Sequence, residues 1–247
     1  MQLLEEVDKK IDCTDSHVLN IERYKAVVWE RRWMALATFS AVIGIVLFVF
    51  AVLSPDWTTI DFTNTNLQHV NVQLGVFGEW RSVNTSNRKP EWISHFPEPA
   101  SHRFLRLAGV YLKHYYRAQA AFCIIGLVMM LFTNGLALYS FTYHRYMFKR
   151  LVAFLYLFTA MCVVLCIEIL LSSVDEWNTE VAHKHQGEWE YSAGQKNGIA
   201  VYLARTVVVI NLIAAAVFAF GSKKQKGNHA ATAEFEIEDR PVHCSRR

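Results

Sequence analysis

The sequence predicts an α-helical membrane protein, in which a bundle of four transmembrane helices carries a small antiparallel β-sheet from the first extracellular loop. Hydrophobic residues make up 53% of the 247-residue chain and gather in long blocks. A block of about 20 apolar residues is long enough to cross a bilayer as a helix. One segment between the first two blocks instead alternates apolar and polar residues, which is typical of a strand with one buried face.

Four blocks meet the length requirement for a membrane span. They comprise residues 33–53, 118–143, 151–171 and 198–220. The first two contain no charged residue, the third contains Glu168 and the fourth contains Arg205. Burial of these helices in a soluble core is disfavoured, because soluble helices of this length usually carry a polar stripe. A long charged segment, 1–32, precedes the first block, which therefore does not resemble a cleaved signal sequence.

Basic residues beside the spans predict the orientation of the chain, because Lys and Arg concentrate on the cytoplasmic side. They precede the first span, fill the turn 144–150 and follow the fourth span: Arg31, Arg32, Arg145, Lys149, Arg150, Lys223, Lys224 and Lys226. The segment 1–32, this turn and the tail 221–247 are therefore predicted to be cytoplasmic. The loops 54–117 and 172–197 are then extracellular, which agrees with a candidate N-glycosylation sequon at Asn84.

The first extracellular loop contains the predicted sheet. Residues 69–76 alternate strictly, with valine or leucine at every second position. Segment 58–63 is rich in β-branched and aromatic residues and is the expected partner strand. Residues 84–99 are rich in Asn, Ser and Pro and are expected to form an exposed excursion. The helical spacing of apolar residues from Phe104 onward predicts a short helix that leads into the second span.

The tryptophan and cysteine residues give further expectations. Trp57 and Trp177 stand beside the ends of spans and are expected to join the aromatic belt at the membrane surface. Trp80 follows the alternating strand and is expected to pack inside the extracellular domain. Neither extracellular loop contains any of the five cysteines, so this domain is expected to hold together without a disulfide. Cys162 and Cys166 are interpreted as small buried thiols rather than as metal ligands.

Glu168 and Arg205 are the charged residues within the predicted spans. A charge inside a bilayer costs about 2.5–3.5 kcal/mol even on insertion scales. Both residues lie near the extracellular ends of their spans at similar depth, so one hypothesis is an ion pair across the helix interface. The alternative is that Arg205 reaches the outer headgroups while Glu168 stands close to water. Two further polar residues, Asn134 and Asn211, are expected to hydrogen-bond between helices.

The two cytoplasmic ends differ in character. Residues 16–32 predict a basic amphipathic helix that lies on the inner leaflet before the chain turns into the first span. The tail 221–247 is polar and too poor in apolar residues to fold alone. These termini offer binding segments for a cytoplasmic scaffold, although a solvated tail explains the composition of 221–247 equally well.

Several of these residues resemble the pattern of the claudin superfamily, which includes peripheral myelin protein, the epithelial membrane proteins and the calcium-channel γ subunits. Members carry a Trp and then Gly-Leu-Trp in a large first loop, which Trp57 and Gly78-Glu79-Trp80 resemble. Arg117 resembles the arginine at the mouth of the second span in claudins. The two loop cysteines of the family are absent here. The resemblance therefore implies a divergent claudin-like member rather than a strand-forming tight-junction claudin.

The resemblance also implies a function. By this resemblance, the chain is expected to be a non-enzymatic protein of cell–cell contacts or membrane organisation at the plasma membrane. Its partners would be the lipid bilayer and other membrane proteins, namely a second copy, junction proteins or a channel. The alternative is an auxiliary subunit that modulates an ion channel or receptor. A small transporter or enzyme is disfavoured, because the sequence shows no polar path, phosphate loop or nucleophile motif. No catalytic residue, cofactor, metal or nucleic acid is expected.

Overall fold

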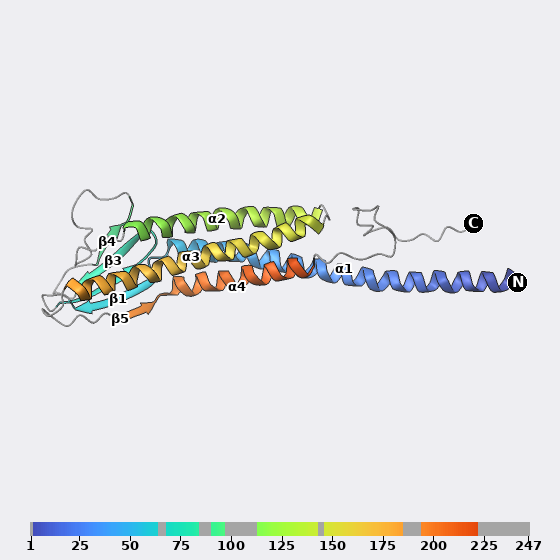
Figure 1. The fold of residues 1–247 in the computed structure, drawn as a ribbon, viewed down its shortest axis with the longest axis horizontal. Coiled ribbons are helices and arrows are strands. Elements are labelled where there is room, and N and C mark those ends of the chain that lie inside the picture. The colour runs from blue at the N-terminus through green and yellow to red at the C-terminus, as the bar shows by residue number, and fades with distance from the viewer. Residues whose placement is uncertain are drawn as a thin grey trace.

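The computed structural model describes residues 2–63, 68–83, 90–96, 113–142, 146–184 and 194–221. Long helices run side by side, and a β-sheet covers one end of the bundle (Figure 1). The helices are α1 (Gln2–Leu53), α2 (Lys113–Thr142), α3 (Tyr146–Lys184) and α4 (Ile199–Phe220). The strands are β1 (Thr58–Thr63), β2 (His69–Leu74), β3 (Gly78–Val83), β4 (Glu91–Ser94) and β5 (Gly194–Asn197).

Each of the four helices contains a segment that is long and apolar enough to cross a membrane, which confirms the predicted fold class. The segments are Val28–Leu53, His114–Phe141, Met147–Thr179 and Ile199–Phe220. In the bundle, α3 packs against both α2 and α4, and α4 packs against α1. Large apolar side chains such as Phe39, Phe154 and Ile213 remain exposed on the helices, and exposed apolar surface of this extent is typical of a membrane-facing protein.

Two helices extend beyond the predicted spans. α1 is one continuous helix of 52 residues, so the turn predicted between residues 16–32 and the first span is not present. Its first part continues the line of the span past the other helices (Figure 1). α3 has 39 residues and ends at Lys184, so part of the predicted loop 172–197 is helical. The physical reason is that Val174 and Trp177 continue the buried face of α3 against the sheet.

The sheet is antiparallel, in the order β4-β3-β2-β1-β5. The β1 and β2 strands pair with Thr58 opposite Leu74, which confirms the predicted partner strands. The prediction that 84–99 is an excursion is wrong for Glu91–Ser94, because these residues pair with β3. Strand β5 pairs with β1 and places the chain at the start of α4. The helix predicted from Phe104 lies outside the described residues until α2 begins at Lys113.

One face of the sheet packs on the helices. Its buried apolar side chains are Ile60, Phe62, Val70, Val72 and Leu74, which cluster with Val174 and Trp177 of α3. The rings of Phe62 and Trp177 meet edge to face, with 5.2 Å between their centroids. Full burial of a large apolar side chain contributes about 1.5–3 kcal/mol. This layer therefore fixes the sheet to the extension of α3.

Trp57 connects the end of α1 to the sheet and to α4. Its indole Nε1 donates a hydrogen bond to the carbonyl oxygen of Ala51, at 2.7 Å. Its backbone N–H donates to the Leu74 carbonyl at 2.9 Å, and its own carbonyl accepts from the Gly198 N–H at 2.8 Å. The side chain is completely buried. One residue thus satisfies buried polar groups of a helix, a strand and the segment before α4.

Asp56 provides the cap for α4. The Ile199 N–H donates to the Asp56 carboxylate Oδ2 at 3.2 Å, and the Ala200 N–H donates to the Asp56 carbonyl at 3.0 Å. A carboxylate at a helix N-terminus is favourable because it faces the unpaired N–H groups and the positive end of the helix dipole. Gly198 allows this close approach, since a Cβ at that position would lie 2.2 Å from the Asp56 carbonyl oxygen.

The burial of the tryptophans differs from the sequence expectations. Trp57 and Trp177 are 0% and 2% exposed, so the prediction that they join an aromatic belt is wrong. Trp80 is 37% exposed, so the prediction that it packs inside the domain is also wrong. The reason is register. Trp80 stands opposite Gln73 on the polar face of the sheet, whereas Trp57 turns beneath the sheet and packs among the helices.

Replacement of Trp57 by alanine is expected to lower the free energy of unfolding by about 3–5 kcal/mol, because it leaves a large cavity and removes an indole hydrogen bond. Trp80→Ala is the matched control and is expected to cost only about 0.5–1.5 kcal/mol, the contribution of an aromatic pair. Thermal unfolding of both variants in the same detergent tests this. Equal losses of stability would contradict the assignment of Trp57 as the connecting residue.

Candidate functional site

The face of the sheet turned away from the helices is the candidate site. Cross-strand pairing places Thr59, Gln73, Trp80 and Trp92 in one row across four strands. A second row contains Asp61, Asn71 and Ser82. These seven residues are called the outward face below. It combines amide, hydroxyl and carboxylate groups with two aromatic rings, whereas the opposite face of β1 and β2 carries an apolar cluster.

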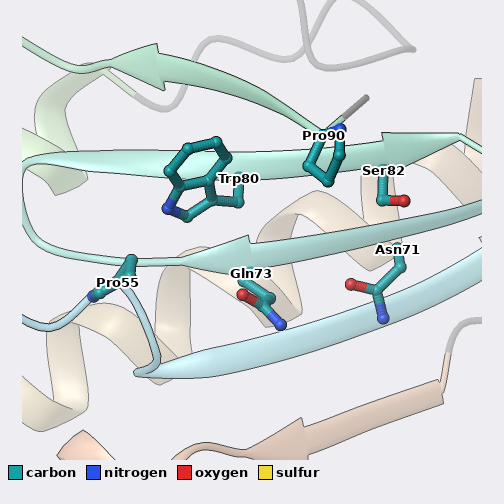
Figure 2. A pocket seen from close by; sticks show the side chains of 6 residues that line it. All are labelled: Pro55, Asn71, Gln73, Trp80, Ser82 and Pro90. Carbon is teal, nitrogen blue, oxygen red and sulfur yellow. The ribbon is translucent and has the colours of Figure 1, made fainter. Parts of the chain in front are cut away.

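A hollow lies on the outward face (Figure 2). Its volume is about 470 Å³, and it is lined by Pro55, Asn71, Gln73, Trp80, Ser82 and Pro90. The indole of Trp80 forms one wall and the amides of Gln73 and Asn71 lie along its length (Figure 2). The Asn71 amide also donates to the Asp61 carboxylate, which fixes its orientation. The hollow therefore offers an aromatic surface beside oriented hydrogen-bonding groups.

Exposed aromatic residues gather at one end of this face. The rings of Trp80 and Trp92 are in contact, with 5.2 Å between their centroids, and Trp92 is 42% exposed. Phe77 immediately precedes β3 and Phe96 follows β4, at the strand ends where Gly78 pairs with Ser94, and both are exposed. This is the end of the sheet that adjoins α1, because β2 ends beside Trp57.

Gly78 is required beneath the Trp92 ring. A Cβ at this position would lie 2.3 Å from Cζ2 of Trp92 and 2.7 Å from the Ile93 carbonyl oxygen. Any side chain would displace the ring or separate β3 from β4. The glycine of the Gly78-Glu79-Trp80 sequence therefore positions the aromatic pair.

Glu79 is a buried carboxylate on the opposite face of β3. Its side chain is 3% exposed, and its Oε1 accepts from Nη2 and Nε of Arg81 at 2.6 and 2.7 Å. His95 Nε2 lies 3.9 Å from the other carboxylate oxygen. The His95 ring stacks on Tyr116 of α2, with 3.9 Å between centroids, and its Nδ1 lies 3.2 Å from the Val76 carbonyl. This cluster joins β3, the end of β4 and α2.

The sequence-predicted site residues lie in different parts of the molecule. Trp57 is in the core, and Gly78 and Trp80 belong to β3 on the outward face. Arg117 is exposed near the start of α2, away from the outward face. Asn84 lies outside the described residues. The structure therefore brings together only Gly78 and Trp80 of this set.

Glu168 and Arg205 do not form the ion pair of the first hypothesis within the described part of the chain. Both side chains are exposed, although α3 and α4 are neighbours. Each lies on the outer side of its helix, because the buried faces are formed by Cys166 and Ile167 on α3 and by Ala204 and Val207 on α4. The Arg205 guanidinium instead lies 5.9 Å from the ring centroid of Tyr202, within range of a cation–π contact.

The expected interhelical hydrogen bonds are confirmed for Asn134 only. The Tyr156 hydroxyl of α3 donates to the Asn134 side-chain oxygen at 3.1 Å. Asn211 instead donates to the Val207 carbonyl of its own helix, at 2.8 Å.

Sequence reasoning missed Asp56, Arg81, Trp92 and His95. The role of Arg81 could have been predicted from the sequence. Residues two apart on a strand share a face, and Glu79 would need a cation nearby if it were buried. The other three act across long sequence separations, so their roles depend on the topology of the sheet. Among the described residues, no group of three or more His, Cys, Asp or Glu side chains is arranged to hold a metal ion.

Four apolar helices, with four of the five strands of an antiparallel sheet between the first two, define a multi-pass membrane protein of the four-span class. The family model described as PMP-22/EMP/MP20/Claudin tight junction matches residues 42–220, well over half of the chain. The chain belongs to this family, which confirms the resemblance and points to a non-enzymatic family. No curated protein matches the chain significantly. In the resemblance of Gly78-Glu79-Trp80 to Gly-Leu-Trp, Glu79 stands where the family pattern has leucine.

Arg81→Leu is expected to lower the free energy of unfolding by about 3–5 kcal/mol, because it leaves the buried Glu79 carboxylate without its closest cation. Glu79→Leu should cost less, since Arg81 is partly exposed and can reach water. The double variant should recover most of the Arg81→Leu loss, because it restores an apolar residue at the family position.

A double-mutant cycle on detergent-solubilised protein, scored by thermal unfolding, measures this coupling. Ser82→Ala, on the opposite face of the same strand, is the matched control and should change stability little. Simple addition of the two single losses would show that Glu79 and Arg81 do not act as a pair.

Proposed function

We propose that this protein is a non-enzymatic, claudin-like protein of cell contacts or membrane organisation at the plasma membrane, and that it acts by binding other membrane proteins. Membership of the family supports this class of function. The outward face supports binding, because it presents a hollow beside an exposed aromatic pair while the other face of the sheet is buried.

The proposal rests on one observation. Trp80 and Trp92 are exposed on the sheet, whereas the tryptophans that pack beneath the sheet are buried. Trp80 is 37% and Trp92 42% exposed. Tryptophan is enriched at protein interfaces and among the residues that contribute most to binding energy, because a large rigid ring loses little entropy when it is covered. The amides of Asn71 and Gln73 add hydrogen bonds that can select a partner.

The location of the aromatic residues indicates the direction from which a partner approaches. Trp80, Trp92, Phe77 and Phe96 lie toward the end of the sheet that adjoins the end of α1. A neighbour in the same membrane can reach this end directly. This placement also favours the second candidate function, an auxiliary subunit that modulates an ion channel or receptor. The identity of the bound partner separates the two functions.

The orientation proposed for the chain places both termini in the cytoplasm and the sheet outside the cell. Epitope tags at either terminus should be stained only after cells are permeabilised, whereas a tag inserted after Asn87, between β3 and β4, should be stained on intact cells. The reason is the concentration of Lys and Arg beside the spans on one side. Staining of a terminal tag on intact cells would overturn this orientation.

A Trp80→Ala/Trp92→Ala variant should reach the cell surface but lose binding to its partners. Full-length tagged protein would be solubilised in mild detergent, and the co-purified proteins would be identified and quantified by mass spectrometry. A loss of roughly tenfold in recovery corresponds to about 1.4 kcal/mol of binding free energy. Recovery of another copy or of junction proteins supports the first function, and recovery of a channel or receptor supports the second.

The control variant is Trp33→Ala, which removes a tryptophan of similar exposure, 46%, from α1. It should leave the recovery of partners unchanged. The proposal fails if the double variant reaches the surface and still recovers the same partners in the same amounts.

A further inference from the structure

Two cysteine thiols meet between α2 and α3. The Sγ atoms of Cys123 and Cys166 lie 2.7 Å apart, and both residues are 0% exposed. Unbonded carbon atoms pack at about 3.5–4.0 Å, and sulfur is a larger atom. The two sulfurs are therefore closer than ordinary packing brings unbonded atoms.

The register of the two helices places these residues opposite each other. One turn further along α2, a Cβ at Gly126 would lie 3.8 Å from Cγ2 of Val163, which is one turn back along α3. The Tyr156 to Asn134 hydrogen bond continues the same antiparallel alignment toward the other end of the bundle. The thiol contact thus follows from how the helices pack, because neighbouring pairs on both elements obey the same register.

The thiols lie in the core on the sheet side of the bundle. Cys123 and Cys166 belong to the same buried cluster as Trp57. Cys166 Sγ also lies 3.9 Å from the carbonyl oxygen of Gln119, one turn before Cys123. Both cysteines are fully buried at this level, so water does not reach the sulfurs.

We propose that Cys123 and Cys166 form a disulfide bond that joins α2 to α3. The S–S bond forms as the two thiols lose two protons and two electrons. A dithiol–disulfide oxidant of the secretory pathway accepts them, and its own disulfide is reduced to two thiols. The exchange passes through a mixed disulfide between the oxidant and one of the two cysteines. Because both thiols are buried once the helices have packed, this exchange takes place before α2 and α3 close over the pair.

The disulfide would lie within the bundle, beneath the sheet. The predicted extracellular loops 54–117 and 172–197 contain no cysteine, so no loop disulfide competes for the oxidant there. The inference goes beyond the proposed binding function and does not depend on which partner is bound. It requires only that the chain is inserted where disulfides form.

Counting thiols in the denatured full-length protein tests the proposal. Cells are lysed in SDS with a maleimide polymer that adds a fixed mass to each free thiol, with and without prior reduction by a phosphine. The wild-type chain should gain two maleimide additions after reduction. Mass spectrometry of the unreduced digest should show the peptides of Cys123 and Cys166 linked.

Three variants make the count specific, and the protein is denatured for the count so that burial does not hide a thiol from the maleimide. Cys123→Ser and Cys166→Ser should each gain no additions after reduction, because the remaining thiol has no partner. Cys162→Ser removes a buried cysteine one turn before Cys166 and should still gain two. Absence of any gain in the wild-type chain, or a gain that persists in Cys123→Ser, would overturn the disulfide.

Discussion

The hydrogen bonds of Asp56 and Trp57 hold the end of α1, strand β2 and the start of α4 at one point. The chain must leave a membrane span and enter a strand there, and its backbone groups are buried by both elements. Buried N–H and C=O groups need partners, and these two residues provide them for segments that are far apart in sequence. Gly198 is the matching constraint, because no side chain fits beside the Asp56 carbonyl.

The sheet then has two faces with different roles. The inner face is apolar and binds the α3 extension, and the outward face is polar apart from its tryptophans. Glu79 is the exception on the inner side, and it is tolerated because Arg81 pairs with it and His95 covers it. A buried charge is costly without partners and is specific in the geometry it accepts. Glu79, which departs from the family pattern, therefore helps to hold β3 and β4 against α2 through a polar cluster.

The sequence was sufficient for features that depend on local periodicity. Four spans follow from apolar length, and the β1–β2 pair follows from strict alternation. Strand β5 carried no such signal, since all four of its residues are exposed and it exists only through pairing with β1. The burial of Trp57 and the exposure of Trp80 were mistaken for a related reason. Strand register and the docking of distant segments decide which face a side chain occupies, and neither is encoded within a few residues of it.

The length of α3 has a mechanical consequence. A helix of 39 residues is roughly 58 Å long, nearly twice the thickness of a bilayer core of about 30 Å. The sheet is anchored on the part of this helix that follows the predicted span 151–171, through Val174 and Trp177. A partner that pushes or pulls on the sheet acts on a rigid lever rather than on a flexible tether. Movement of the sheet is therefore coupled to the tilt of α3 against its neighbours α2 and α4.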